Sequence, residues 1–264
     1  METTGFRSTP RILWNSVILQ MKDNVLSSYF ISTLFIQPVI FTLILVGTYL
    51  YGNKPNLGLF AITGTGLISI WNNNLFTSGE IIRGERRSGT LSLILATPTP
   101  LILILLGKSF ANAITSVFAM GITFATGMIA FRLPIGIADP LTFLIGLVLV
   151  VVSITCLGLV FGSLFILTRN AGEFVSVANF PVYILSGLSI PLTLLPLWTR
   201  PLSNLLTPTW GSIILNQAAS QAGGNMLPNY LWIVGLSIIY LLLAWVLYRR
   251  VEYLALRAGT LEQW

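Results

Sequence analysis

The stretch IIRGERRSGTLSLILATPTPLILILLGK, from Ile81 to Lys108, is a polar interruption between two apolar runs of membrane length. Five charged residues lie between Glu80 and Arg87, after which the chain becomes apolar and reaches Pro98 and Pro100. The apolar and polar positions between these groups have the spacing of a short helix with one apolar and one polar face. Such a helix at a membrane surface can rest on lipid and still present charge to a soluble partner.

The composition predicts a membrane protein. Hydrophobic residues make up 55% of the 264 residues, charged residues make up 8%, and the mean hydropathy is +0.85. Soluble globular proteins carry about 25% charged residues, so a chain this poor in charge is expected to lie in lipid. The single cysteine, Cys156, excludes an intramolecular disulfide, and we interpret it as a small packing residue.

Apolar runs predict an all-α integral membrane protein with six transmembrane helices, since about 20 apolar residues suffice to cross a bilayer. The expected spans cover residues 27–51, 57–78, 101–131 and 141–167, a broken run from 174, and residues 230–248. The broken run holds five prolines: Pro181, Pro191, Pro196, Pro201 and Pro208. One spanning helix cannot absorb that many prolines, so we expect short re-entrant or external helices between spans 5 and 6.

Residues 1–25 are predicted to form an N-terminal interfacial amphipathic helix that Pro10 opens. Its apolar side is expected to hold Trp14, Val17, Ile18, Met21 and Val25. Its polar side is expected to hold Arg11, Asn15, Gln20, Lys22 and Asp23. A solvated helix packed on the protein is the alternative interpretation. The domain plan is thus this helix, a six-span transmembrane domain over 26–250, and a short cytoplasmic tail over 251–264, following Arg249-Arg250.

The polar interruption resembles the signature loop of the type 2 ABC exporter permeases. The matching residues are Glu85-Arg86-Arg87-Ser88-Gly89-Thr90-Leu91, then Leu95 and Thr97-Pro98. In that family the loop lies between the second and third membrane helices and forms a cytoplasmic coupling helix that docks into a separate ATP-hydrolysing subunit. This sequence departs from the pattern at Ser92, where many members carry an acidic side chain.

The resemblance implies a function, partners and site residues. The implied function is that of a permease subunit of an ATP-driven exporter, which forms the translocation path with a second permease subunit in a homodimer or heterodimer. ATP and Mg²⁺ would be bound by the partner ATPase, with no cofactor in this chain. The implied coupling residues are Glu85, Arg86, Arg87, Gly89, Thr90, Leu91, Thr97 and Pro98. The substrate class stays open among drugs, lipid-linked molecules and polysaccharides.

Polar residues inside the apolar runs are candidates for the translocation path. Asn72, Asn73 and Asn74 fall in the later half of the second span, and Gln37 falls inside the first. Buried amides in lipid must find partners across helices, so interhelical hydrogen bonding is the plainer interpretation of the asparagines. Four aromatic residues are candidates for stacking on sugars, with membrane anchoring as the alternative: Trp71, Phe76, Trp198 and Trp210.

The distribution of basic residues predicts the orientation. With the N-terminus inside, the cytoplasmic set is Arg7, Arg11, Lys22, Arg83, Arg86, Arg87, Lys108, Arg169, Arg249, Arg250 and Arg257. The external set is Lys54, Arg132 and Arg200. Because cytoplasmic loops carry the excess of Lys and Arg, both termini and the 85–98 segment are expected in the cytoplasm, in a prokaryotic inner membrane. The basic residues flank apolar runs instead of forming one tract, so the net charge of +6 does not indicate nucleic-acid binding.

Other functions are disfavoured by what the sequence lacks. Gly107-Lys108-Ser109 ends like a phosphate-binding loop, but Ile102 stands where the first glycine is needed. The chain has no histidine and no acidic cluster, so a catalytic or metal site is not expected. No charged residue is expected deep inside a span, which argues against an ion-coupled carrier. A passive channel, or a scaffold that recruits a cytoplasmic partner, remains the alternative to the exporter.

Overall fold

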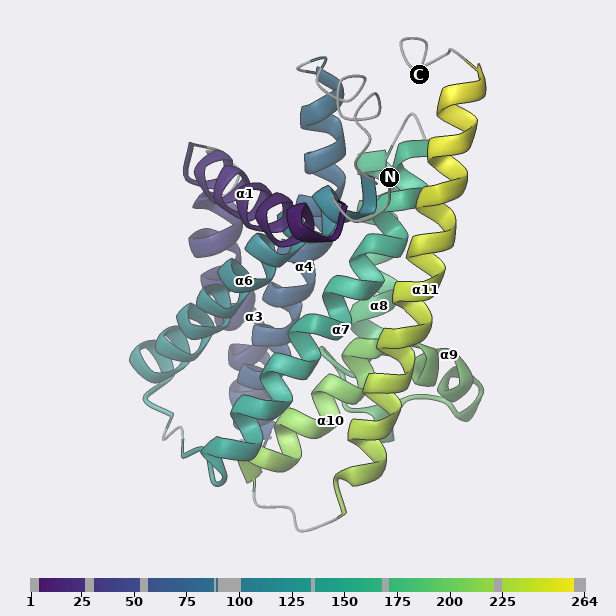
Figure 1. The fold of residues 1–264 in the computed structure, drawn as a ribbon. Helices are drawn as coiled ribbons and strands as arrows, with labels where there is room; N and C mark the ends of the chain where they lie inside the picture. The colour runs from purple at the N-terminus through teal and green to yellow at the C-terminus, as the bar shows by residue number, and fades with distance from the viewer. Residues whose placement is uncertain are drawn as a thin grey trace.

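All regular elements in the described part of the computed structural model are helical, which confirms the all-α class (Figure 1). The structure describes residues 5–26, 31–52, 57–87, 89, 101–133, 136–167, 171–220 and 225–258. The elements are α1 (Gly5–Leu26), η1 (Ser32–Ile36), α3 (Gln37–Tyr51), α4 (Gly58–Arg87), α6 (Leu101–Phe131), α7 (Pro140–Leu167), α8 (Ala171–Leu185), η3 (Leu192–Leu194), η4 (Leu197–Thr199), α9 (Arg200–Leu205), α10 (Thr207–Ser220) and α11 (Leu227–Ala258).

Four described helices are long and apolar enough to cross a membrane. They cover Ser32–Tyr51, Ile102–Phe131, Pro140–Ser163 and Leu227–Arg250, and they coincide with four of the predicted spans. The other two predicted spans fall on α4, which carries three consecutive asparagines, and on α8, which has only 15 residues. The protein is therefore a multi-pass membrane protein, and the count of six spans stays a prediction.

Two helices continue past the ends predicted from hydropathy. α4 was expected to end at Ser78 but runs to Arg87, and α11 continues past Arg250 to Ala258. The segment expected as a tail over 251–264 is thus helical as far as Ala258. Hydropathy marks where lipid ends, whereas a helix can extend into water when its residues, here rich in Leu, Ala, Glu and Arg, favour helix.

Two prolines lie inside helices instead of at their ends. α1 begins at Gly5, so Pro10 does not open it, and α8 passes through Pro181 to Leu185. α8 also begins at Ala171, three residues before the predicted start of the broken run at 174. A single proline removes one backbone hydrogen bond, which a membrane helix tolerates when neighbouring helices enclose it.

The first span begins with the π-helical segment η1, which periodicity did not predict. Pro38 follows η1 as the second residue of α3. Proline has no N–H to donate to the preceding turn, so a wider turn before it costs fewer hydrogen bonds than elsewhere. The buried side chain in this segment is that of Thr33.

The remaining prolines separate the predicted short helices after α8. Pro191 and Pro196 immediately precede η3 and η4, while Pro201 and Pro208 lie in the first turns of α9 and α10. In those first turns the missing N–H would have no helical partner in any case. The chain leaves α8 at Gly187, whose φ of +69° is readily adopted only by glycine. The segment from α8 to α10 is therefore broken, as the prolines predicted.

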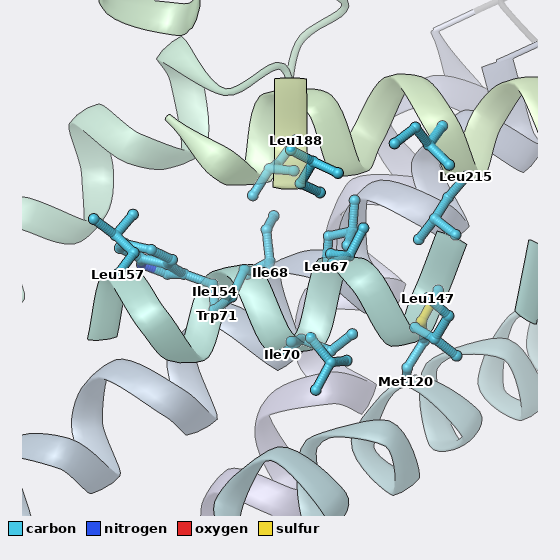
Figure 2. Packing of buried hydrophobic residues seen from close by; sticks show 14 of the residues in the cluster. Leu67, Ile68, Ile70, Trp71, Met120, Leu147, Ile154, Leu157, Leu188 and Leu215 are labelled. Atoms are coloured by element: carbon cyan, nitrogen blue, oxygen red, sulfur yellow. The ribbon is translucent and has the colours of Figure 1, made fainter. Parts of the chain in front are cut away.

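α4 lies at the centre of the packing. It contacts α3, α6, α7, α8 and α10, and its residues contribute to the main cluster of buried apolar side chains (Figure 2). At Gly64 a Cβ atom would stand 2.1 Å from the Leu188 carbonyl oxygen, so glycine allows the turn after α8 to lie directly against α4. α11 contacts α7, α10 and α6 at the side of the bundle.

The Arg87 end of α4 and the Ala258 end of α11 lie at the same, upper end of the bundle in Figure 1. α1 crosses the bundle near that end, and α9 and α10 lie in the lower half of the view. The last turn of α4 and the last turns of α11 thus belong to one end of the molecule.

Candidate functional site

Four consecutive residues of α4, numbers 71–74, form a buried polar cluster that we call the hub. Trp71 and Asn73 are fully buried, and Asn72 and Asn74 are 3% and 2% exposed. The helix is surrounded here by other helices, so these side chains radiate toward different neighbours. Sequence reasoning placed the three asparagines in the later half of a span, and the structure places them at its centre of packing.

The first two hub residues hold α8. The indole Nε1 of Trp71 donates to Asn179 Oδ1 at 2.9 Å, and the Tyr183 hydroxyl donates to Asn72 Oδ1. The Tyr183 ring also meets Phe41 of α3 edge to face, with ring centroids 6.3 Å apart. α3, α4 and α8 are therefore joined at one level of the bundle.

The other two hub residues hold α6 and α7. Asn73 Nδ2 donates to the Asn112 carbonyl oxygen at 3.3 Å and to Thr115 Oγ1 at 3.1 Å. Asn74 Oδ1 accepts from Thr155 Oγ1 of α7 at 3.2 Å. The hub thus connects α4 to three separate helices through side-chain hydrogen bonds.

Interhelical hydrogen bonds of this kind contribute about 0.6 kcal/mol each on average in membrane proteins, and at most about 1.7 kcal/mol. Together they favour one arrangement of the helices, while each is weak enough to exchange during a conformational change. The structure therefore shows the interhelical bonding expected of the asparagines, and their place along a path stays a prediction.

Gln37, the fourth predicted path residue, is the first residue of α3 and is partly buried. Its Oε1 atom is buried without a hydrogen-bond partner in the described part of the chain. An unpaired buried acceptor costs free energy, so this amide is a position where the helix packing is not fully satisfied.

The predicted coupling residues fall at and beyond the end of α4. Glu85, Arg86 and Arg87 form its last turn, so they do not belong to a separate short helix. Gly89 is exposed and has a φ of +70°, a left-handed conformation that ends the helix with a turn. The remaining predicted residues lie outside the described ranges: Thr90, Leu91, Thr97 and Pro98.

Lys108 lies in the second turn of α6, near the Ile102 end of the 30-residue span Ile102–Phe131, and is only 3% exposed. Its charge is thus buried within the protein near one end of the span, and the absence of charge deep inside a span stays a prediction. The same location shows that Gly107-Lys108-Ser109 is part of the continuous helix α6. A phosphate cradle needs a loop with free backbone N–H groups, so this segment cannot bind nucleotide in that way.

The aromatic residues considered for sugar stacking have different environments. Trp71 is fully buried, so it offers no face to a ligand. Trp198 is 74% exposed, and Trp210 stacks on Trp232 of α11 with centroids 5.6 Å apart and an interplanar angle of 9°. The pair Trp210–Trp232 joins α10 to α11, which is a structural role.

These features define the class of the protein: a multi-pass α-helical membrane protein with a polar centre and apolar outer faces. The family model of the ABC-2 type transporter matches residues 11–219, from α1 to nearly the end of α10. The chain belongs to the ABC-2 type transporter family, as a membrane permease.

Similarity to known proteins covers a part of the chain. Over 129 residues it is 30% identical to the "Probable multidrug ABC transporter permease YbhR" of Escherichia coli strain K12. The same identity is found with the protein of that name from Escherichia coli O157:H7. The aligned part is 49% of this chain and 34% of those relatives, so the chain matches about a third of their length.

Sequence reasoning missed most of the residues that complete the hub: Asn112, Thr115, Thr155, Asn179 and Tyr183. Asn112 and Asn179 are amides inside apolar runs, which is the signal that could have found them. Their pairing with α4 depends on helix packing, which hydropathy does not specify.

Proposed function

We propose that this chain is the permease subunit of an ATP-driven ABC exporter and couples to a separate ATPase subunit through residues 85–98. The observation that carries the proposal is the continuity of α4, a single helix that contains the hub and ends at Arg87. Residues 74 and 85 lie eleven positions apart (85 − 74), which is about 16 Å along an α-helix. Because no loop interrupts α4, a push at Arg87 moves the hub directly.

The mechanism follows from the continuity of α4 between the hub and Arg87. Two permease subunits form the path, and two ATPase subunits, which bind ATP and Mg²⁺, dock against the 85–98 segments. Closure of the ATPase subunits tilts α4. The tilt breaks the hydrogen bonds that join Trp71 and Asn72 to α8, and the path opens outward. Rigid-body rocking between two discrete packings is an established way to drive such an opening.

Each coupling residue has a proposed role. Glu85, Arg86 and Arg87 make charged contacts with the ATPase surface, and Gly89-Thr90 form the turn. Leu91 is an apolar position of the segment in the sequence, and Thr97-Pro98 fix the angle at which the chain enters α6. The positive φ of Gly89 supports the turn assignment.

The orientation and cargo complete the proposal. The shared position of the α4 and α11 ends supports placing them together on the cytoplasmic side of a prokaryotic inner membrane, since basic residues concentrate there. The name of the Escherichia coli relatives favours a lipophilic drug as substrate over a lipid-linked molecule or polysaccharide. The dimer is a homodimer or a heterodimer of two related permeases.

The test uses the double variant R86E/R87E in the complex with its ATPase. Spin labels at Ile40 of α3 and Val177 of α8, both exposed, report movement between the two helices in a C156A background. We expect a nucleotide-dependent change in this distance in the parent protein and none in R86E/R87E, with both proteins inserted normally. The control R250E/R257E reverses two charges on α11 at the same end of the molecule. It should keep the nucleotide-dependent change in the Ile40–Val177 distance.

Unchanged coupling in R86E/R87E would contradict the role of the two arginines. If the Ile40–Val177 distance does not respond to nucleotide even in the parent complex, the passive channel or scaffold is favoured over the exporter.

A further inference from the structure

α1 attaches to the bundle largely through polar side chains. Its chief neighbour is α6, and the side chains it buries include Ser16, Gln20 and Asn24. Its exposed side is mixed: it carries the large apolar residues Trp14, Ile18, Leu19 and Val25 and the polar residues Arg11, Asn15, Lys22 and Asp23. This amphipathic exposed side can lie in the bilayer surface. Val17, expected on the apolar side, and Gln20, expected on the polar side, are instead both buried in the protein.

The two helices approach closely where they cross. A Cβ atom at Gly107 of α6 would lie 2.7 Å from the Ser16 Cβ and 2.8 Å from the Leu13 carbonyl oxygen. No larger residue fits at that position without moving α1. The crossing thus brings the buried amides of α1 within reach of α6.

A chain of amides runs from α1 into α6. Gln20 Nε2 donates to Asn24 Oδ1 at 2.7 Å, and Asn24 Nδ2 donates to Asn112 Oδ1 at 2.8 Å. The backbone carbonyl of Asn112 in turn accepts the hydrogen bond from Asn73 of the hub. One residue of α6 therefore contacts both the surface helix and the central helix.

Asn112 is also incompletely satisfied. Its side chain is 1% exposed, and its Nδ2 atom has no hydrogen-bond partner within the described ranges. A buried donor without an acceptor raises the free energy of this arrangement relative to one that pairs it. In the described part of the chain, the Asn24–Asn112 hydrogen bond is thus the amide contact between α1 and α6, and it can be replaced by another pairing of Asn112.

We propose that Gln20, Asn24 and Asn112 are positioning residues that form a latch between α1 and the hub. While the latch is closed, α1 and the central helix move together, so the position of α1 at the membrane surface controls the rocking of α4. The latch rests on the proposed function, because it assigns the way in which α1 takes part in the transport movement.

The test replaces all three amides with apolar residues of similar size in Q20M/N24L/N112L. Removing every partner together leaves no unpaired buried amide, so the fold is retained, and the Asn112 carbonyl that serves Asn73 is kept. The control T126V removes a hydroxyl of α6 that bonds only within its own helix, to the Ile122 carbonyl oxygen.

Two distances are measured in the complex with the ATPase, in a C156A background. Labels at Lys22 and Phe118, both exposed, report docking of α1 on α6, and labels at Ile40 and Val177 report rocking. Loss of the Asn24–Asn112 hydrogen bond, the amide contact that joins the two helices in the described part of the chain, should shift the docked population about threefold toward separation. The nucleotide-dependent change between Ile40 and Val177 should be lost in the triple variant and kept in T126V.

A triple variant with the parent Lys22–Phe118 distance and the parent response to nucleotide would overturn the latch. If the parent complex shows no response to nucleotide, the proposed function fails. The Lys22–Phe118 distances of the parent and the triple variant then decide the latch alone: equal distributions refute it, and a broadened one in the triple variant supports it.

Discussion

α4 and α11 have opposite relations between polarity and burial. α4 carries three asparagines in succession, yet its described side chains from Ala61 to Leu75 are all buried. α11 is apolar over Leu227–Arg250, yet only 17% of that window is buried in the protein. A water-soluble fold would place these two helices the other way round.

The difference follows from the solvent. Lipid tails are as apolar as leucine, so an apolar side chain gains little by leaving lipid for protein. An amide or hydroxyl in lipid has no water to bond with, so it must find a partner inside the bundle. Polarity therefore decides which helix lies at the centre, and the polar helix is the one that can transmit movement to several neighbours.

The largest expected effect is on folding, and it separates a glycine in a close contact, Gly64 of α4, from one in open space, Gly235 of α11. Gly64→Leu should prevent folding, because its Cβ would overlap the backbone oxygen of Leu188, whereas Gly235→Leu on α11 adds a side chain where no atom lies within 4 Å. The recovery of monodisperse protein from detergent measures the difference. Equal recovery of the two variants would mean that α4 is not closely packed.

The second effect tests whether the exposed side of α11 faces lipid. Ile239 is 58% exposed near the middle of the span, and Ile239→Lys should cost about 3 kcal/mol there, since a lysine at the bilayer centre loses its hydration. Tyr253→Lys, at a residue 57% exposed beyond the span, should cost far less. Unfolding free energies in bicelles compare the two, and equal costs would place α11 outside the bilayer.

A smaller effect concerns the contact between the hub and α8. A double-mutant cycle of Asn72→Leu and Tyr183→Phe should give a coupling free energy of about 0.6–1.7 kcal/mol, the range for such bonds in membranes. The matched variant Ser237→Ala on α11 removes a hydroxyl that bonds only within its own helix, to the Ile233 carbonyl oxygen. The coupling free energy between Ser237→Ala and Tyr183→Phe should be zero. A zero coupling free energy between Asn72→Leu and Tyr183→Phe as well would show that the hub does not hold α8.

The smallest effect lies outside both helices, at the start of α7. The Thr142 hydroxyl and then the Thr142 backbone N–H donate to Asp139 and lower the pKa of its carboxyl. A lowered folded-state pKa stabilises the fold above the ordinary value of 3.8, and this contribution disappears as the pH falls through the folded-state pKa. The difference in thermal stability between the parent and Asp139→Ala should therefore narrow as the pH falls below 3.8. A gap that stays constant with pH would contradict the role of the charge.

Hydropathy predicted the helices whose surroundings are lipid. The bounds of α6 match the predicted run over 101–131, and α7 starts one residue before the predicted 141, because lipid-facing residues are apolar all along such helices. The breaks after α8 were also predictable, since the prolines at 191, 196, 201 and 208 act locally on the backbone.

The failures occurred where packing between helices decides. The face that α1 turns inward holds Gln20 and Asn24, which hydropathy assigned to water or left unplaced, because the partner amide on Asn112 lies 88 residues away in the sequence. The ends of α4 and α11 were placed too early, since hydropathy stops at the lipid boundary. The asparagines of the hub were recognised, but their three partner helices required the fold.

The measurement that tests the central claim most directly is co-purification in mild detergent. The tagged chain is co-expressed with its genomic neighbours, and the purified material is assayed for ATP hydrolysis. We expect an ABC ATPase subunit in equal amount, with ATP hydrolysis that is lost in the R86E/R87E variant. Recovery of the permease alone, without nucleotide-dependent activity, would contradict this expectation.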